Sequence, residues 1–592
     1  MSAGEHHDPL RPTWVGIAQD WLRRDGLAIL LYLVATVIMT YPLAFKMNGQ
    51  WLAFGDIDTY VKLWDKWWLA NRLFAGEPMF YTTDQFYPIG VDLAYHSISW
   101  TVTLGWWLMG LVFNNIVAYN LTIFIAIFST GYAAYLLINT LVERRTAAWL
   151  GGLVYTFAPY HIAHTAGHPD LVHLAPIPLA VLLLGYALSR RKPWPALAAA
   201  LMIGIAALTS LYIMVFALLT VLAVFAWTVV DRANWRDKRY WFIILVFGIG
   251  CVIFLAPRLA PVFRNPEALT SAIDAKYTAD EDQTDLLAFI VPSQDNPLFG
   301  PYVEPITNQF LMNKKWPAYL GLVPLALTGV AVTWQKRRRQ ILPWFLAALL
   351  FMVLSLGPVL RFNGQVHESI PLPAAALSWF PPIRAVGRPD YFVLGILLPL
   401  GVCAAFGLDR LLAALGDNRI ARAGLTLGLT VLLLFEFWNG PYPVISAGVN
   451  PFYERLAQED GDFAVINLPI GRKPAKVYVY EQTIHNRPIV EGIIARTPDD
   501  AYDYINSNYL LSLWRRRQPL SCSSQSAEEI QLALDQLVSD GFRYVIIHNR
   551  DKAWELFSSY FPVEAVHEDG ELRVYRLSDV QDNPPCSPAG ST

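Results

Sequence analysis

Long apolar runs separated by short polar segments fill the chain up to about residue 440. The run at residues 27–45 is long enough for one bilayer crossing, which takes about 20 mostly apolar residues. It exceeds the core of a signal peptide and no small-residue cleavage pattern follows it, so it predicts a retained first span. Further runs of this kind lie at residues 116–141, 147–160, 171–188, 195–211, 213–230, 240–260, 318–334, 341–360, 391–415 and 423–438. The pattern predicts an α-helical polytopic membrane protein with about eleven transmembrane helices.

The composition agrees with this class. Of the 592 residues, 54% are hydrophobic and 16% are charged, whereas soluble domains carry about 25% charged residues. The mean hydropathy is +0.34. The formal net charge of -3 gives no basic excess, so a nucleic-acid partner is excluded. The four cysteines show no CxxC or Cys/His spacing, and we therefore expect neither a disulfide framework nor a zinc site.

The positions of Lys and Arg between the runs predict the orientation in the membrane. Basic clusters lie at residues 23–24, 144–145, 190–192, 232–239, 336–339 and 410–422. All of these clusters lie on the same side of the membrane if residues 99–113, a run too short to cross it, lie at the membrane surface. The N-terminus, residues 1–26, is then cytoplasmic. The segments expected outside are residues 46–115, 161–170, 261–317, 361–390 and the chain after 439.

The chain changes character after the last run. A membrane domain over residues 27–440 is followed by residues with ordinary soluble composition, in which the short apolar stretches 463–466 and 544–547 have the character of strands. Between them, residues 527–537 show helical spacing. This pattern predicts a small extracytoplasmic α/β domain over residues 441–580. The Pro/Ser-rich tail, residues 581–592, is predicted to be disordered.

The densest candidate chemistry directly follows the first span. Asp56 and Asp58 come after Gly55, and a turn there would bring both carboxylates onto one cation or one hydroxyl. A carboxylate near lipid is costly without a partner, which makes both residues candidates for a functional site. The alternative for Asp58 is to cap the helix that follows it.

That helix is predicted by the amphipathic segment at residues 60–74. Trp64, Trp67 and Trp68 lie on one side of it, and tryptophan favours the headgroup level, so the helix is expected along the outer membrane surface. The stretch Tyr87-Pro88-Ile89-Gly90 then leads the chain back to the membrane.

A first span, a long external loop that opens with Gly-Asp-x-Asp, a Trp-rich surface helix and a Tyr-Pro-x-Gly stretch together resemble the GT-C superfamily of membrane glycosyltransferases. The nearest resemblance is to a bacterial group related to the protein mannosyltransferases and aminoarabinose transferases. It implies transfer of a sugar from a polyprenyl-phosphate donor to a glycan, lipid or protein acceptor at the outer face of the plasma (inner) membrane. It also implies that an acidic residue of the first loop acts as base toward the acceptor or holds a metal ion. That role falls to Asp56 and, second, to Asp58.

A histidine-rich loop follows at residues 161–173, with Asp170 among its four histidines. Imidazole and carboxylate groups suit a transition metal, proton exchange or a hydrogen bond to phosphate, or they are simply solvated at the membrane surface. We expect His164, His168 and Asp170 to line the active cavity. The resemblance implies the same for Asp170. No cofactor is required, although the candidates for holding a divalent cation are Asp56, Asp58, His168 and Asp170.

Two arginines lie four residues apart in a proline-flanked external loop. The guanidinium groups of Arg384 and Arg388 match phosphate oxygens, so we expect them to bind the phosphate of the lipid-linked donor. The alternative is contact with ordinary lipid headgroups.

These features together favour an inverting glycosyltransferase of a bacterial cell envelope. Asp56 would deprotonate or orient the acceptor, and the arginines would stabilise the departing phosphate. Two alternatives remain: a transporter of lipid-linked sugars or lipids, and a non-catalytic membrane assembly factor that works through its C-terminal domain. The charges gather at the outer ends of the spans, which favours an external active site over a transport path.

Overall fold

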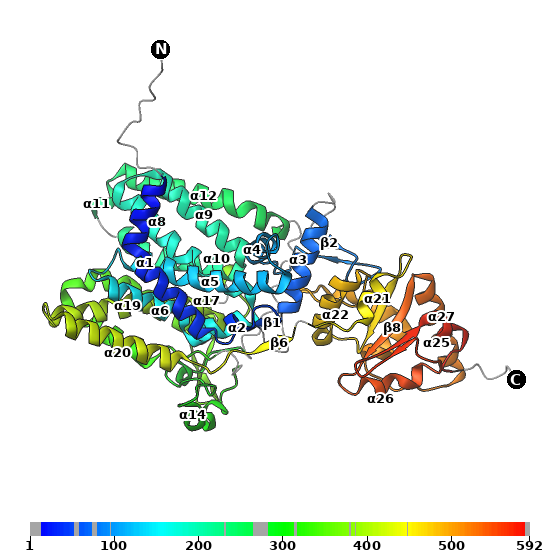
Figure 1. Cartoon of the computed structure of the whole chain (residues 1–592). Coiled ribbons are helices and arrows are strands. Elements are labelled where there is room, and N and C mark those ends of the chain that lie inside the picture. The colour runs from blue at the N-terminus through cyan, green and yellow to red at the C-terminus, as the bar shows by residue number, and fades with distance from the viewer. Residues whose placement is uncertain are drawn as a thin grey trace, which may run out of the picture.

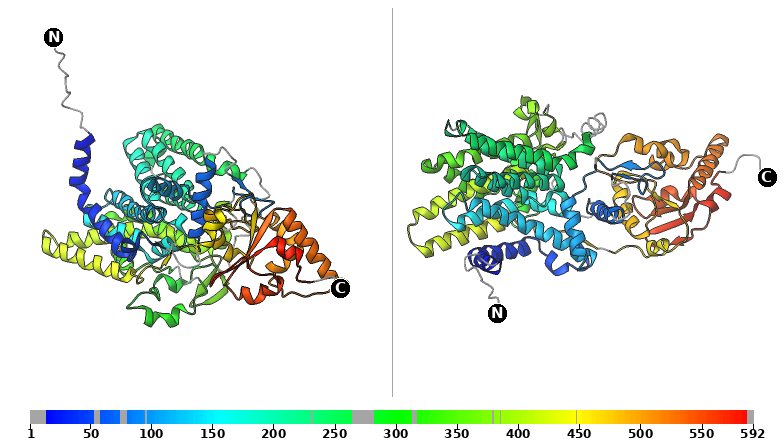
Figure 2. Two further views of the ribbon diagram at one scale, coloured as in Figure 1. Left: turned by 45° about the vertical axis from the view of Figure 1, so that its right-hand side comes forward. Right: turned by 90° about the horizontal axis from the view of Figure 1, so that it is seen from above.

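A bundle of long helices and a smaller body built around a β-sheet lie next to each other in the computed structural model (Figure 1). Both views of Figure 2 show the same arrangement. The structure describes residues 14–52, 58–73, 80–94, 96–229, 232–263, 282–312, 317–377, 380–384, 386–446 and 448–586.

Apolar helices make up the bundle. They are α1 (Trp14–Met39), α5 (Asn115–Ile138), α6 (Arg145–Phe157), α8 (Pro176–Arg190), α9 (Pro193–Thr209), α10 (Leu211–Val229), α12 (Lys238–Phe263), α15 (Leu322–Val332), α16 (Arg338–Ser355), α19 (Val393–Ala414) and α20 (Arg419–Phe437). Within the described ranges, 7 helices are long and apolar enough to cross a membrane. The predicted helical membrane fold is thereby confirmed. The count of about eleven crossings stays a prediction, since the helices over several of the runs, such as α9 and α15, are shorter.

Close contact between helix backbones holds the centre of the bundle together. A Cβ atom added to Gly401 in α19 would lie 2.4 Å from the carbonyl oxygen of Gly151 in α6, and one added to Gly151 would lie 2.5 Å from that of Gly401. Small residues allow this approach, which is typical of helix pairs in membranes. The apolar stretch of α19 is buried throughout, so α19 is the central helix of the bundle.

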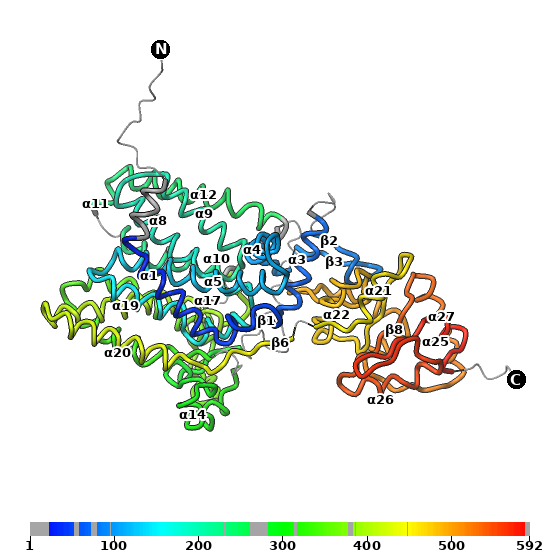
Figure 3. The backbone as a smooth tube through the Cα atoms, viewed as in Figure 1, coloured from blue at the N-terminus to red at the C-terminus, as the bar shows by residue number. Residues whose placement is uncertain are grey.

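Shorter elements surround the bundle. Helical ones are α2 (Leu43–Lys46), α3 (Thr59–Leu73), α4 (Trp100–Gly110), α7 (Pro159–Gly167), η1 (Pro169–Leu171), α11 (Arg232–Trp235), η2 (Leu286–Phe289), α14 (Gly300–Thr307), η3 (Gln335–Arg337), α17 (Pro373–Leu377), α18 (Pro381–Arg384) and η4 (Pro389–Phe392). Three antiparallel strand pairs join them: β1 (Gln50–Leu52) with β6 (Val444–Ser446), β2 (Tyr81–Thr82) with β3 (Val91–Asp92), and β4 (Val359–Phe362) with β5 (Gln365–Pro371). Figure 3 shows β1 beside β6, which joins the first loop to the start of the C-terminal part.

The C-terminal body contains a four-stranded sheet in the order β7-β8-β10-β9. Strands β7 (Ala464–Leu468) and β8 (Phe542–His548) are parallel, whereas β10 (Leu572–Arg576) is antiparallel to both β8 and β9 (His567–Glu568). Its helical elements are α21 (Phe452–Ala457), α22 (Arg472–His485), η5 (Asp499–Tyr502), α23 (Asp503–Ser507), α24 (Tyr509–Arg515), α25 (Ser524–Ser539), α26 (Ala553–Phe557), η6 (Ser558–Tyr560) and α27 (Leu577–Asp582).

Alternate strand residues face two different layers of helices, as the period of two in a strand requires. Val465 and Ile546 pack in one cluster with Val479 of α22. Ile466 and Val545 belong to a second cluster, which contains the apolar side of α25. Helix α22 therefore covers one face of the sheet and α25 covers the other.

Helix α3 packs against α22. Trp64 and Trp68 are fully buried in the cluster that also holds Val479, and Nε1 of Trp64 donates a 2.7 Å hydrogen bond to Oε1 of Gln482. The prediction that the tryptophans face the headgroup layer is wrong for Trp64 and Trp68, while the position of α3 along the outer membrane surface stays a prediction. Amphipathicity reveals an apolar side but not the partner that covers it, and here the partner is the C-terminal body.

The C-terminal tail also differs from expectation. Cys522 and Cys586 form a disulfide across a sequence separation of 64 residues, with Cα atoms 5.5 Å apart. The expectation of no disulfide is wrong because this pair is brought together by the fold and follows no local spacing pattern. Residues 581–586 are ordered, contrary to prediction, since α27 runs to Asp582 and Cys586 is buried. Residues 587–592 lie outside the described part.

Candidate active site

A pocket opens where the bundle, the first loop and the C-terminal body meet. It encloses about 570 Å³, counted with its open mouth. Its lining residues are Asp58, Val61, Lys62, His96, Ser97, His168, Asp170, Tyr212, Tyr391, Arg472, Ile493, Ile494 and Ala495. Stretches distant in sequence, among them two of the three predicted site loops, thus contribute to one cavity.

Asp58 directly precedes α3, and its backbone oxygen accepts a hydrogen bond from the Lys62 amide at 3.0 Å. Its carboxylate points elsewhere: Oδ1 lies 3.0 Å from Nζ of Lys476, and Oδ2 lies 3.5 Å from Nε2 of His168. The side chain is 35% exposed. Burial alone would raise the pKa of Asp58, but His168 and Lys476 outweigh it and lower the pKa to about 2. Asp58 is therefore an anion at neutral pH.

Asp56 and Gly55 lie outside the described residues. The assignment of Asp56 as the first candidate for the base stays a prediction.

His164 and His168 form a pair at the edge of the pocket. Helix α7 ends before His168, and the two Nδ1 atoms lie 2.9 Å apart, so a single proton lies between them. Burial and the neighbouring His168 hold the pKa of His164 well below its usual value. The ring of Tyr391 lies 5.6 Å from that of His164 and 6.1 Å from that of His168, which restricts both rings. The structure thus places His168 beside Asp58, with His164 behind it.

Asp170 lies in η1 and lines the same pocket, almost fully buried. His161, in contrast, is fully buried with Nδ1 2.6 Å from the Thr156 oxygen and Nε2 2.9 Å from the Val172 oxygen. These contacts give His161 a structural role.

Three buried residues behind Asp58 were missed from the sequence. Nζ of Lys62 lies 3.2 Å from Oδ2 of Asp65, whose Oδ1 lies 2.6 Å from Nε2 of His96. Burial alone would lower the pKa of Lys62, but Asp65, Asp170 and Asp58 raise it. The spacing of Lys62 and Asp65, three residues apart on a helix, is the one sequence signal for this group.

The C-terminal body contributes two more residues that sequence reasoning missed. Arg472, the first residue of α22, lines the pocket, and Lys476 contacts Asp58 as described above. A basic pair four residues apart at the start of a helix is a visible signal, but only the tertiary structure places it against the first loop.

The predicted arginines lie near the pocket without lining it. Nη2 of Arg388 lies 3.0 Å from Oδ1 of Asp282 and 2.9 Å from Oδ2 of Asp390. Its guanidinium carbon lies 4.9 Å from the ring centre of Tyr391, which does line the pocket. Arg384 is exposed at the end of α18. Arg388 is thus held by two carboxylates, and phosphate binding by either arginine stays a prediction.

A divalent cation needs several ligand atoms that converge on one point. Within the described ranges, no group of three or more His, Cys, Asp and Glu side chains is arranged to hold a metal ion. Both oxygens of Asp58 face other groups, the Lys476 ammonium and the His168 ring. A carboxylate already in contact with an ammonium is a poor cation ligand, so Asp58, His168 and Asp170 as arranged fit a resident cation poorly.

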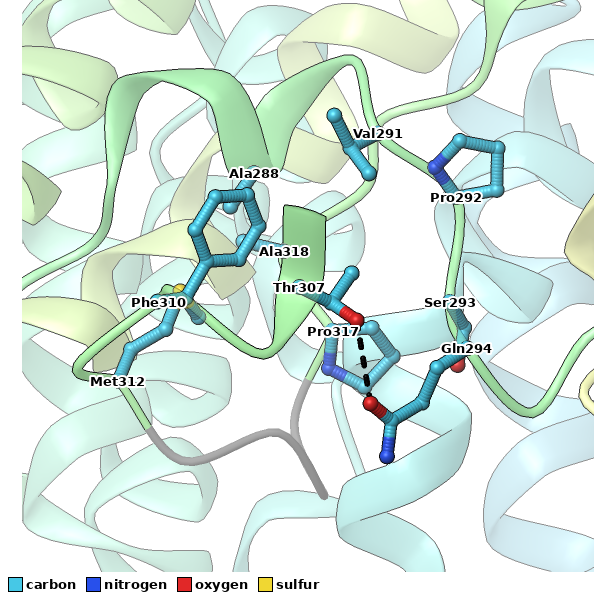
Figure 4. Close-up of a pocket in the computed structure, with 10 residues that line it drawn as sticks. All are labelled: Ala288, Val291, Pro292, Ser293, Gln294, Thr307, Phe310, Met312, Pro317 and Ala318. Carbon is cyan, nitrogen blue, oxygen red and sulfur yellow. Dashed lines mark hydrogen bonds between the residues drawn. The ribbon is translucent and has the colours of Figure 1, made fainter. Parts of the chain in front are cut away.

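A second, smaller hollow lies between η2, the end of α14 and the segment at residues 317–318 (Figure 4). Its walls are mostly apolar, with Val291 and Phe310 among them, and Oγ1 of Thr307 donates a 3.1 Å hydrogen bond to Oε1 of Gln294. None of its lining residues is ionisable. This hollow therefore offers no acid–base or ion-binding chemistry.

Three solved glycosyltransferase structures are similar to this chain. The apo oligosaccharyltransferase of Archaeoglobus fulgidus has a TM-score of 0.51 and 11% sequence identity, over 92% of this chain and 73% of that one. The arabinofuranosyltransferase AftD from Mycobacteria has a TM-score of 0.54 and 12% identity, over 94% of this chain and 41% of that one. ArnT from Cupriavidus metallidurans, bound to undecaprenyl phosphate, has a TM-score of 0.49 and 13% identity, over 95% and 98%. The first two establish a GT-C fold, which confirms the predicted resemblance.

Sequence comparison gives the family but no activity. Among proteins with curated descriptions, none matches this sequence. Residues 28–433, more than half of the chain and nearly all of the helical bundle, match the family described as "Domain of unknown function (DUF6311)". The chain therefore belongs to the DUF6311 family.

Proposed function

We propose that this protein is an inverting membrane glycosyltransferase that moves a sugar from a polyprenyl-phosphate donor to an acceptor at the extracytoplasmic face. The observation that carries the proposal is the position of Asp58, a charged carboxylate in an open pocket that also contains Lys62 and Arg472. The GT-C fold supports it, since similar structures include an oligosaccharyltransferase and an arabinofuranosyltransferase.

The pocket provides the groups that such a transfer needs. The acceptor hydroxyl donates a hydrogen bond to Asp58 and loses its proton to it while the acceptor oxygen attacks the anomeric carbon. The bond between that carbon and the phosphate oxygen breaks, and its electron pair leaves on the phosphate. Lys62 and Arg472 stabilise this developing charge. His168, fixed by His164, orients the Asp58 carboxylate.

Asp56 remains the alternative base, and Arg384 and Arg388 remain candidates for contacts with the lipid phosphate. The proposed reaction needs no cation. A glycan, lipid or protein of the cell envelope is the acceptor class, and membrane lipids surround the bundle.

The proposed location is the plasma membrane, with the N-terminus in the cytoplasm and the pocket and C-terminal body outside. The Cys522–Cys586 disulfide supports this orientation, because disulfides persist in oxidising compartments.

A transporter would carry its ionisable residues at mid-membrane along a path between the helices. Here they come from α3, η1 and the C-terminal body, which favours an enzyme. An assembly factor acting through residues 441–580 alone would not need the pocket residues of the bundle.

The test uses the purified full chain in lipid nanodiscs with radiolabelled polyprenyl-phosphate hexoses and pentoses and cell-envelope acceptors. Asp58→Asn should lower transfer by about 100-fold or more. Asp417→Asn, at a fully exposed position, is the matched control. Asp56→Asn, measured in parallel, decides between the two aspartates. Wild-type transfer in Asp58→Asn would remove Asp58 from the mechanism, and no transfer from any polyprenyl-phosphate sugar would contradict the proposed function.

A further inference from the structure

Helix α22 presents two cations from the C-terminal body to the pocket. Arg472 and Lys476 are four residues apart and so lie on the same side of the helix. Arg472 lines the pocket, and Nζ of Lys476 lies 3.0 Å from Oδ1 of Asp58. Lys473, the next residue along the helix, is exposed and is not among the lining residues.

Hydrogen bonds to uncharged groups hold the guanidinium group of Arg472 in place. Nη1 donates to Oγ1 of Thr497 at 3.0 Å, and Nη2 donates to the backbone oxygens of Ile494 and Ala495 at 2.8 and 3.2 Å. In the part of the chain that the structure covers, Arg472 makes no ion pair with Asp or Glu. A guanidinium fixed in this way keeps its full charge for an anion that enters the pocket.

The other two cations of the site have carboxylate partners of different character. Lys62 is almost fully buried and shares Asp65 with His96, so it is fixed. Lys476 is 20% exposed and contacts Asp58, which is 35% exposed. An ammonium on a flexible four-carbon stem near solvent can exchange one anion for another at little cost.

We propose that Arg472 and Lys476 bind the phosphate of the donor, and that Lys476 changes partner when the donor enters. In the resting protein Lys476 holds Asp58. When a phosphate lies beside Arg472, Lys476 turns to it and releases Oδ1 of Asp58, which then accepts the acceptor hydroxyl. The inference rests on the proposed function and adds two points to it: Lys476 joins Arg472 at the donor phosphate, and the donor binds before the acceptor.

The test measures phosphate binding without any transfer. Undecaprenyl phosphate is titrated into the full chain in nanodiscs, and binding is followed by native mass spectrometry. Arg472→Gln and Lys476→Gln should each weaken binding by about tenfold or more. Lys473→Gln, which removes a charge from the same helix outside the pocket, should leave binding unchanged. Equal weakening by all three variants would overturn the assignment.

A double-mutant cycle tests the change of partner. Asp58→Asn should tighten undecaprenyl phosphate binding by about threefold to tenfold, because Lys476 no longer has a competing anion. In a Lys476→Gln background the same substitution should have no effect. If Asp58→Asn tightens binding equally in both backgrounds, the effect is general repulsion and the exchange of Lys476 is refuted.

Inorganic phosphate distinguishes the sources of the anion. If the donor is lipid-linked, inorganic phosphate should compete more weakly than undecaprenyl phosphate, and this preference for the lipid should disappear in Arg472→Gln. Equal affinity of the wild-type protein for both ligands would refute the lipid-linked assignment. The outcomes separate from those of the transfer assay. If the double-mutant cycle gives the expected result but the protein transfers no sugar, the phosphate site is supported and the proposed enzymatic function is refuted. If Lys476→Gln shows wild-type transfer and wild-type phosphate binding, the proposed function stands and this inference is refuted.

Discussion

Oδ1 of Asp65 lies 2.6 Å from Nε2 of His96, and both side chains are almost completely buried. Nδ1 of His96 accepts a 3.1 Å hydrogen bond from the backbone amide of Ala495, so Nε2 carries the ring proton and donates to Asp65. The pair connects α3 to the segment of the C-terminal body that lines the pocket.

Asp65→Asn should destabilise the protein by about 3 kcal/mol, because it removes the one carboxylate charge in direct contact with the buried Lys62 ammonium among the described residues. Thermal unfolding of the full chain in detergent measures the loss. Lys62→Met in the same background should restore part of it, since the two residues interact directly. An unchanged unfolding temperature in Asp65→Asn would show that this ion pair does not stabilise the site.

Gly401→Ala should destabilise the bundle by about 1 to 3 kcal/mol, because the new methyl group would overlap the Gly151 carbonyl at the contact between α6 and α19. Gly424→Ala is the control: it also lies in an apolar helix, but nothing lies within 4 Å of its added Cβ. Unfolding in detergent compares the two variants. Equal stability would mean that the two helices do not approach this closely.

Glu481 predicts a pH dependence of stability. Burial raises the pKa of Glu481 from its usual 4.5 to about 8. Over this range the folded protein keeps the Glu481 proton that the unfolded chain loses. The contribution of Glu481 to the free energy of unfolding is therefore fully present at acidic pH and is lost as the pH rises from about 4.5 to 8. Glu481→Gln should be more stable than wild type at alkaline pH, with a difference that grows by up to about 1.4 kcal/mol for each pH unit between 4.5 and 8 and then levels off. Thermal unfolding over this range measures the difference, and parallel curves for both proteins would refute the raised pKa.

The disulfide predicts which side of the membrane carries the C-terminal body. In intact cells, a membrane-impermeant maleimide should label the exposed Cys522 only after mild reduction, because Cys522 is bonded to Cys586. Cys251 and Cys403 are buried in the bundle and serve as internal controls that stay unlabelled. Labelling that requires permeabilised cells would place this body in the cytoplasm.

Removal of divalent cations should leave glycosyl transfer at its wild-type rate, since the Asp58 carboxylate already contacts Lys476 and His168. A chelator titration of the transfer assay measures this. Restoration of a lost activity by Mg²⁺ or Mn²⁺ would show that a cation displaces Lys476 from Asp58.

The sequence by itself was sufficient for the membrane class and for the positions of most helices and of strands β7 and β8. Apolar periodicity is a local property, so each run reveals its own element. It does not reveal burial, since α12 is as apolar as α19 but only α19 is buried throughout. The sequence also singled out Asp58, His168 and Asp170, which line the pocket, and His164, which lies behind it, since ionisable groups beside apolar spans are conspicuous. Their roles stay predictions.

Only the tertiary structure decided which of these residues meet, and with what partners. Helix α22 is separated from α3 by about 400 residues of chain, yet Lys476 contacts Asp58 and Gln482 binds Trp64. No local pattern encodes such a pairing, because it depends on how two bodies pack and on which apolar faces cover each other. For the same reason Arg388 is held by Asp282 and Asp390, and Cys586 lies beside Cys522. Charge and periodicity can be read from a single segment, whereas a functional site forms only where several segments come into contact.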